Sequence, residues 1–430
     1  MSASFHEPSP APVVRFAMSR VRNAALKSKI MSAQDAAAFR QWKSADGRTV
    51  EAAYLGVEAS SVKMKLRNGT TYSVPLDKLS PEDQTWAQAQ AAASASSGGS
   101  SGAPAAEKMW PRSVALDDKP EVTVVREDAE KKEFVYRSPH YEFVCDSRLG
   151  GNVVREFGRM FEATYLLNCK LPLDLKPKPE PLREFFQARL FTERNDYLAA
   201  GGLEGSGGVY RSGEKALMVP LSSLGVKMVG SRVTLDKASD DDNATLIHEI
   251  THQMMNHWLP LIPTWYTEGS AEYTEILEYS PSGRFTLSGL RQRLEAYVTR
   301  VNFWRTTPFK MLDLKYLMEI GGREWAAGLT TPVQVQNVTG ATQAGQNYGS
   351  AGLLTYYFYH LDGNGDAANI IAYLRELEAA GRGADEPAIA KKHLLRERTH
   401  EQLAADVQKA LKKEGVAVEF DAPRSSGSTQ

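Results

Sequence analysis

The chain has 430 residues, 42% of them hydrophobic, so it is long enough to bury a sizeable core and to form more than one domain. Its 51 Lys and Arg residues nearly balance its 52 Asp and Glu residues, which argues against binding to nucleic acid or to an anionic membrane surface. No stretch reaches the roughly 18 consecutive apolar residues that a membrane-spanning helix needs. We therefore expect neither a membrane span nor a nucleic-acid partner.

The two ends of the chain are expected to be disordered tails, over residues 1–34 and 421–430, because they offer few large apolar side chains. The first tail has no uninterrupted run of about 7 to 15 apolar residues, which a secretory signal requires. Cys145 and Cys169 give no further guide, since either a disulfide or two free thiols fits them. The location stays open between an exported and a cytoplasmic protein.

Residues 35–88 read as short strands joined by turns. TVEAAYLGV, SVKMKLRNG and TTYSVPL alternate apolar and polar residues, and the Asn-Gly pair is a strong hairpin signal. These strands fit a small β-barrel. The run from Trp42 to Asp83 resembles Sla homology domain one, an SH3-like module, in its Trp, DGR turn, YLGV strand and closing VPLDKLSPED. The resemblance implies a ligand-binding module, although for Trp42 and Tyr72 core packing is favoured over a ligand groove.

The next division of the chain is a composition break. Residues 89–108 lie within AQAQAAASASSGGSSGAPAAEK and are expected to form a flexible linker. Residues 109–420 then form a larger unit, in which HYEFVCDS predicts a strand and VVREFGRMFEATYLL an amphipathic helix. From Ser288 onwards, apolar residues recur mostly at helical spacing. This order predicts an α+β fold with a mixed-sheet lobe, a helical lobe and a cleft between them.

The stretch ATLIHEITHQMMNHW, residues 244–258, carries two histidines and a glutamate in an otherwise apolar run. It has no Pro or Gly and follows SDDDN, whose last Asp or Asn can cap a helix start. On a helix, His248 and His252 lie one turn apart on one face, so both imidazoles can reach one point. Glu268 follows in PTWYTEGSAEYTEILEY, near the start of a second predicted helix. It can supply the third ligand of a catalytic zinc site, whose fourth position holds water.

HEITH and WYTEGSAEY together resemble the gluzincin metallopeptidases. The second segment looks especially like the WLxEGxAEY of the aminopeptidase branch and of bacterial peptidase-MA-like proteins. The resemblance implies a thermolysin-like domain that holds one Zn²⁺ per chain and hydrolyses peptide bonds. It makes His248, His252 and Glu268 the metal ligands, Glu249 the general base and Glu272 a carboxylate that orients a ligand imidazole. A GxMEN-type motif for a free amino group is not evident, which favours an endopeptidase or another amide hydrolase.

The same resemblance places a tyrosine ahead of a glycine-containing helix, where its hydroxyl stabilises the developing oxyanion. GQNYGSAGLLTYYFYHL offers Tyr348 in a comparable place. The glycines follow Tyr348 at one and four positions and so depart from the YxxG of the aminopeptidase branch. Tyr356, Tyr357 and Tyr359 stay as alternatives, and so does a packing role for Tyr348.

Substrates of such enzymes commonly pair with an edge strand beside the active helix. GSGGVYRSGEKALMVPL, with its apolar strand from Ala216 to Leu221, is the candidate for that edge.

The remaining histidines are expected to be structural. His257 points off the ligand face of its helix, and the others lack ligand-like spacing: His140, His360, His393 and His400.

Two functions fit the sequence. The first is a zinc-dependent peptidase with Glu249 as its base, acting on peptide or protein substrates, whose N-terminal module is tethered by the linker and raises the effective concentration of whatever it holds. The second is a non-catalytic binding or scaffold protein, with a residual zinc site, that acts through the module and its peptide or protein ligand. The intact Glu249 favours the first, because a pure binder needs no base.

Overall fold

The chain divides into two compact units, Met18–Gly102 and a larger one that contains Ala103–Gln430. The computed structural model describes residues 39–58, 61–66, 71–96, 110–204, 206–224, 226–229, 232–235, 240–303, 308–334 and 342–423. These residues combine helices and strands, as the α+β prediction requires. Among them, no helix is long and apolar enough to cross a membrane.

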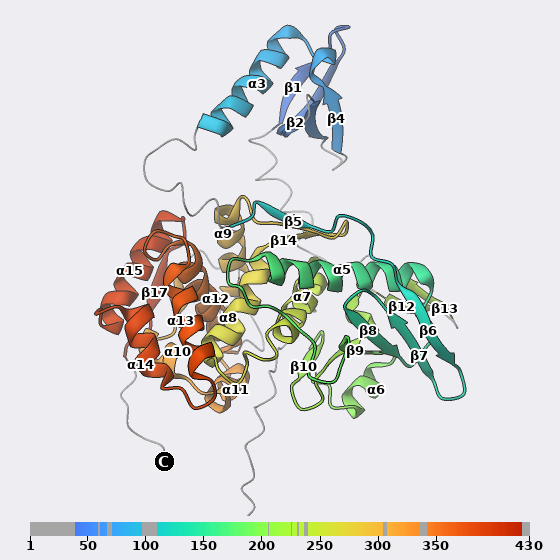
Figure 1. The fold of residues 1–430 in the computed structure, drawn as a ribbon. Coiled ribbons are helices and arrows are strands. Elements are labelled where there is room, and N and C mark those ends of the chain that lie inside the picture. Colours follow the sequence, from blue (N-terminus) through green and yellow to red (C-terminus); the bar gives the residue numbers. More distant parts are fainter. Residues whose placement is uncertain are drawn as a thin grey trace, which may run out of the picture. The chain divides into compact units, whose positions relative to one another are not determined.

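The N-terminal unit is an antiparallel sheet followed by a helix (Figure 1). Its elements are β1 (Phe39–Lys43), β2 (Thr49–Glu58), β3 (Ser61–Leu66), β4 (Thr71–Pro75), the short η2 (Leu76–Lys78) and α3 (Pro81–Ser96). The strands pair in chain order, so β1 and β4 are the two edges of the sheet. The closed β-barrel that we expected is therefore not present among residues 39–96 as far as the structure describes them.

Helix α3 covers the core of this unit. The side chain of Trp86 lies edge-on to the rings of Trp42 and Tyr54, with ring centroids 5.4 Å apart in both pairs. Trp42 is fully buried and donates its indole N–H to the carbonyl of Ala52, which confirms its core role. Tyr72, in contrast, is 52% exposed, so its predicted core role is wrong.

Helix α3 also extends into the stretch predicted as linker. It continues to Ser96, where Ala, Ser and Gln favour or tolerate helix without large apolar side chains. The remainder of that stretch, residues 97–108, lies outside the described residues, as do the predicted tail 1–34 and most of 421–430.

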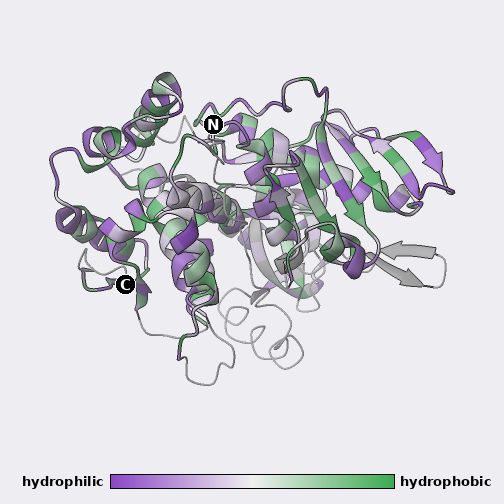
Figure 2. Cartoon of the chain, turned by 90° about the horizontal axis from the view of Figure 1, so that it is seen from below, coloured by the Kyte–Doolittle hydropathy of each residue, from purple (hydrophilic) through white to green (hydrophobic). Residues whose placement is uncertain are grey.

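The larger unit is built on a six-stranded mixed sheet in the order β10-β11-β9-β8-β7-β6. The strands are β6 (Thr123–Asp128), β7 (Glu133–Arg137), β8 (Tyr141–Cys145), β9 (Phe186–Phe191), β10 (Val209–Arg211) and β11 (Ala216–Pro220). Along β6 to β8, hydrophobic and hydrophilic residues are interleaved (Figure 2).

Cys145 of β8 and Cys169 are both free thiols, so the disulfide alternative is wrong.

The strand that we predicted as the edge of the sheet, β11, is the second strand from the edge. Strand β11 pairs with β9 in parallel and with β10 in antiparallel orientation, so Ala216 and its neighbours lie inside the sheet. All five residues of β11 are buried. The edge is β10, from the same glycine-rich segment.

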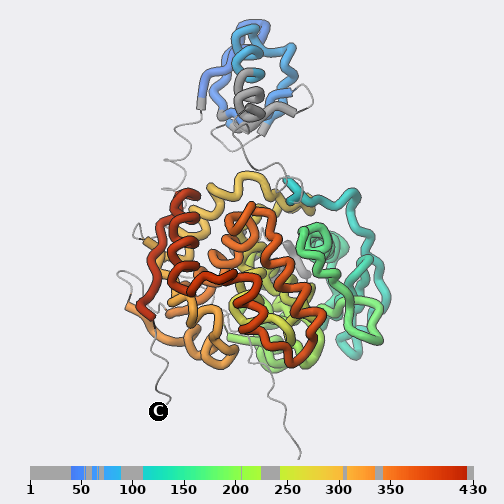
Figure 3. The backbone as a smooth tube through the Cα atoms, turned by 60° about the vertical axis from the view of Figure 1, so that its left-hand side comes forward, coloured from blue at the N-terminus to red at the C-terminus, as the bar shows by residue number. Residues whose placement is uncertain are grey.

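Helices dominate the rest of the larger unit. Long helices are α5 (Gly151–Lys170), α7 (Asp240–Met254), α8 (Thr264–Ile276), α9 (Leu290–Val301), α12 (Ala344–His360), α13 (Ala368–Ala380) and α15 (His400–Lys413). Shorter ones are α6 (Arg194–Ala199), η3 (Leu221–Leu224), α10 (Leu314–Glu319), α11 (Gly322–Thr330), α14 (Glu386–Ala390) and η4 (Lys391–Leu395). Those from α9 onwards gather on the side of this unit away from the six-stranded sheet (Figures 1 and 3).

Three small sheets complete the described part of the larger unit. In the first, β15 (Arg284–Thr286) lies between β14 (Glu278–Ser280) and β5 (Ser113–Ala115). The other two pair β12 (Val226–Val229) with β13 (Arg232–Leu235), and β16 (Phe309–Met311) with β17 (Val418–Phe420).

Helices α8 and α12 pack backbone against backbone at a glycine of the EGSAEY segment. A Cβ atom on Gly269 would overlap the Thr355 hydroxyl and the carbonyl of Ala351. The two helices therefore approach each other so closely at this point that only glycine fits.

We therefore expect Gly269→Ala to lower the free energy of unfolding by about 1 to 3 kcal/mol, because the added methyl group must displace backbone. Urea unfolding followed by circular dichroism measures the loss. Gly322→Ala is the matched control, since nothing lies within 4 Å of its added Cβ. Equal unfolding midpoints for the two variants would contradict the tight packing.

Candidate metal centre

The predicted site residues are all buried on two helices that pack together. His248, Glu249 and His252 lie on α7, and Glu268 and Glu272 lie on α8, each with at most 3% of its surface exposed. Helix α7 begins at Asp240, so the Asp and Asn expected to cap it lie inside its first turns. Burying this many polar groups is costly unless each one is paired or binds an ion.

Three of these side chains converge on one point. Nε2 of His248 lies 3.0 Å from Nε2 of His252, and Oε2 of Glu268 lies 3.5 Å from both nitrogens. Ligand atoms about 2.0 to 2.1 Å from a tetrahedral zinc ion are about 3.4 Å apart. The three separations therefore fit a zinc site, and the three residues form a group that can hold a metal ion.

The charge of Glu268 also fits a cation. Burial raises the pKa of this carboxyl, but His252 and His248 beside it lower the pKa more strongly, to about 2. The carboxylate is therefore an anion, and its Oε2 atom is buried without a hydrogen bond from any described residue. A hydrogen bond between the two imidazoles would satisfy one nitrogen of each and leave this oxygen unpaired, whereas a metal ion satisfies all three atoms.

Glu249 follows His248 on α7 and faces the edge strand of the sheet. Its Oε2 atom accepts the backbone N–H of Tyr210, in β10, at 3.3 Å. Gly208, just before β10, allows this approach: its Cβ atom would lie 3.2 Å from the carbonyl of Met218 and 3.8 Å from Cγ of Glu249. The predicted base thus lies beside the strand that ends the sheet.

Glu272 lies where the resemblance implies. Its Oε1 atom is 3.4 Å from Nδ1 of His248, and its Oε2 atom accepts the hydroxyl of Tyr297 at 2.7 Å. A second carboxylate that we did not predict lies closer: Oε1 of Glu275 is 3.1 Å from the same nitrogen. Glu275 also pairs with Arg300, at 2.9 Å. Its spacing, one turn after Glu272 on α8, was the signal that could have revealed it.

Tyr348 lies beside the predicted ligands. Its ring centroid is 6.0 Å from that of His248, and the two rings meet edge-on. It also packs against Trp325, with centroids 5.5 Å apart, so the structure supports contact with the site and a packing role at once.

The alternative tyrosines have partners elsewhere. The hydroxyl of Tyr357 donates to Asp362 at 3.2 Å, and Tyr359 shares a hydrogen bond with a buried tyrosine of α8. Tyr356 packs against the imidazole of His360. Tyr348 is therefore the strongest of the four candidates.

The other histidines do not join the ligand group. His257 contacts Asn256 and Trp258, and burial lowers its pKa. His140 and His393 each pair with a glutamate at 2.6 Å. Within the described residues, none of them takes part in a group that can hold a metal ion.

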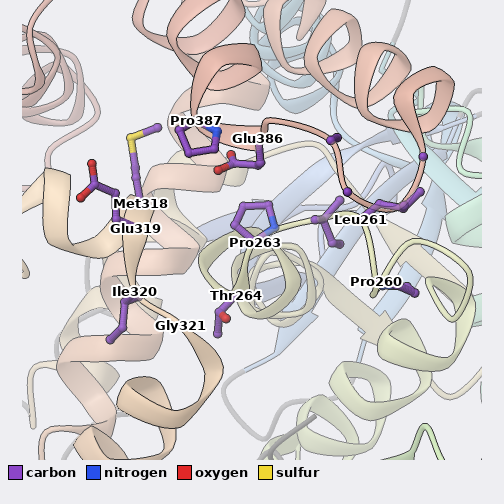
Figure 4. A pocket seen from close by; sticks show the side chains of 14 residues that line it. Pro260, Leu261, Pro263, Thr264, Met318, Glu319, Ile320, Gly321, Glu386 and Pro387 are labelled. Atoms are coloured by element: carbon purple, nitrogen blue, oxygen red, sulfur yellow. The ribbon is translucent and has the colours of Figure 1, made fainter. Parts of the chain in front are cut away.

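A cavity of about 380 Å³ lies at the start of α8 (Figure 4). Its wall is formed by residues 260–264, 318–321, 381, 383, 384, 386 and 387, which include Glu319 and Glu386 (Figure 4). Neither Glu249 nor any predicted ligand lines it. This cavity is therefore not the predicted active-site cleft.

Comparison with known proteins identifies the smaller unit. No curated protein and no solved structure matches the chain. Residues 31–95 match the family model of SLA1 homology domain 1 (SHD1), which spans all four strands of the N-terminal sheet and nearly all of α3. The N-terminal unit thus contains an SLA1 homology domain 1.

Proposed function

We propose that the chain is a zinc-dependent peptidase, acting as an endopeptidase through its larger unit. The observation that carries the proposal is the convergence of His248, His252 and Glu268, whose ligand atoms lie within 3.5 Å of one another in a buried site. The sequence places Glu249 directly beside the first ligand. This set of three metal-binding side chains and one additional carboxylate is typical of catalytic zinc sites that hydrolyse amides.

The protein's own groups supply the rest of the reaction. Zinc at this site would lower the pKa of a bound water and polarise the carbonyl under attack. Glu249 takes up the water's proton and passes it to the leaving amine. The hydroxyl of Tyr348 is the candidate donor to the developing oxyanion. Edge strand β10 offers its backbone to an extended substrate beside Glu249, which favours a polypeptide over a small amide.

The direct test is metal-dependent cleavage of peptides. A library of internally quenched peptides with blocked ends is incubated with the zinc-loaded chain, after chelation, and after zinc is restored. We expect cleavage that chelation abolishes and zinc restores. Cleavage that is unchanged by chelation would contradict the zinc mechanism, and an absence of cleavage across the library would contradict the endopeptidase proposal.

A binding function is the second candidate, because residues 31–95 match SHD1 and modules of this kind mediate protein interactions. The two functions are compatible: the module would hold a protein that the larger unit cleaves. Glu249 distinguishes the two functions, because a peptidase needs it as a base and a binding protein does not.

A further inference from the structure

Two carboxylates converge on the outer nitrogen of His248. Nδ1 lies 3.1 Å from Oε1 of Glu275 and 3.4 Å from Oε1 of Glu272, while Nε2 faces the other two predicted ligands. An imidazole that binds a metal through Nε2 carries its proton on Nδ1 and has one N–H to donate. Of the two carboxylates, Glu275 lies nearer to that nitrogen.

Helix α9 holds both carboxylates by their other oxygen atoms. Tyr297 donates to Oε2 of Glu272 at 2.7 Å, and Arg300 donates to Oε2 of Glu275 at 2.9 Å. Tyr297 and Arg300 are three residues apart and so project from the same side of α9.

The two partners differ in charge, and this difference matters in a buried site. The side chains of Glu272 and Glu275 are fully buried, where a negative charge is costly without a cationic partner. Tyr297 is a neutral donor and supplies no such charge. Arg300 is a permanent cation, and its side chain is 32% exposed, so it brings a positive charge from the surface to Glu275.

We propose that Arg300 positions His248 through Glu275, so that an Arg300–Glu275 pair on α9 and α8 orients the imidazole for zinc together with Glu272. Arg300 and Glu275 are positioning residues, since neither reaches the metal-binding face of His248. The inference deepens the proposed function and rests on the zinc site proposed there.

A glutamine at position 275 tests the pair because it removes one acceptor and keeps the shape. Oε2 of Glu275 accepts a hydrogen bond from Arg300, and its Oε1 lies 3.1 Å from Nδ1 of His248. The amide of Glu275→Gln has a single oxygen, so its NH₂ group must face one of two donors. We expect zinc affinity to fall by about 10- to 100-fold, as measured by competition with a chromophoric chelator.

Arg300→Met, alone and combined with Glu275→Gln, tests whether Arg300 acts through Glu275. In the single variant Glu275 loses its cationic partner, so we expect Arg300→Met to lower zinc affinity. In the double variant we expect no loss beyond that of Glu275→Gln, because the carboxylate through which Arg300 acts is already gone. Wild-type affinity in Arg300→Met, or a further loss in the double variant, would overturn the role of Arg300.

Glu278→Gln is the matched control. Glu278 lies three residues after Glu275 and also pairs with an arginine, Arg293, at 2.7 Å. Its side chain is 63% exposed and faces no predicted ligand. Its zinc affinity should equal that of the wild type, and circular dichroism of the metal-free variants checks that all are folded.

Three further outcomes are decisive. Wild-type affinity in Glu275→Gln would overturn the inference while leaving the peptidase proposal intact. A second zinc ion per wild-type chain that disappears in Glu275→Gln would also overturn it, because Glu275 would then be a ligand. A folded wild type that binds no zinc would instead remove the proposed function itself.

Discussion

Replacing Glu249 by glutamine is expected to lower kcat for peptide hydrolysis by about 10²- to 10⁴-fold while the chain keeps its zinc. The amide is nearly the same size as the carboxylate, and its oxygen can still accept the N–H of Tyr210. It cannot take up a proton from water at neutral pH. The variant therefore removes the base and leaves the fold and the three ligands in place.

The measurement combines kcat on a peptide that the wild type cleaves with zinc content by inductively coupled plasma mass spectrometry. Glu156→Gln makes the same substitution on α5, where the carboxylate pairs with Arg159, and should retain full activity. If the wild type and Glu249→Gln behave identically in every hydrolysis assay, the peptidase proposal fails. The SHD1-based binding function would then be the better account.

The double variant His248→Ala, His252→Ala is expected to lose zinc completely, from one ion per wild-type chain to none. Two of the three converging atoms disappear, and the remaining carboxylate of Glu268 cannot hold zinc alone at submicromolar concentration. Metal content of protein purified without chelator, again by mass spectrometry, gives the answer directly.

His257→Ala is the control for that experiment, since its imidazole follows the same helix but contacts Asn256 and Trp258 instead of the ligands. It should keep one zinc ion per chain. A folded wild type that takes up no added zinc would show that the imidazoles of His248 and His252 pair with each other as buried structural groups.

The local part of the site follows from the sequence alone. The spacing of His248 and His252 places both imidazoles on one face of any helix, because a turn contains 3.6 residues. A run without Pro or Gly favours that helix on local grounds, and α7 confirms it. Glu268 and Glu272 were identified by the resemblance of WYTEGSAEY to a known family, and the structure brings both to His248.

The parts that were missed depend on which elements pack together. Arg300 lies on α9, far along the chain from His248, and a sequence pattern within one helix cannot show that it reaches Glu275. The barrel expected for residues 35–88 fails similarly, because the strands were recognisable but the edges of their sheet were not.

The sheet edge beside Glu249 shows the same division most clearly. The apolar run of β11 indicated a strand, whereas the close approach at Gly208, just before β10, is seen only in the structure. Continuous apolar character belongs to a strand covered on both faces, which is why β11 lies inside the sheet. Strand β10 is short and forms the edge of the sheet, in the order β10-β11-β9. This order depends on contacts between the strands and cannot be read from the pattern within any one of them. The sequence by itself determined helix α7 and the ligand pair on it, since those depend on local periodicity. Only the tertiary structure decided the strand order and the place of Glu275 and Arg300 beside His248, since those depend on packing between separate elements.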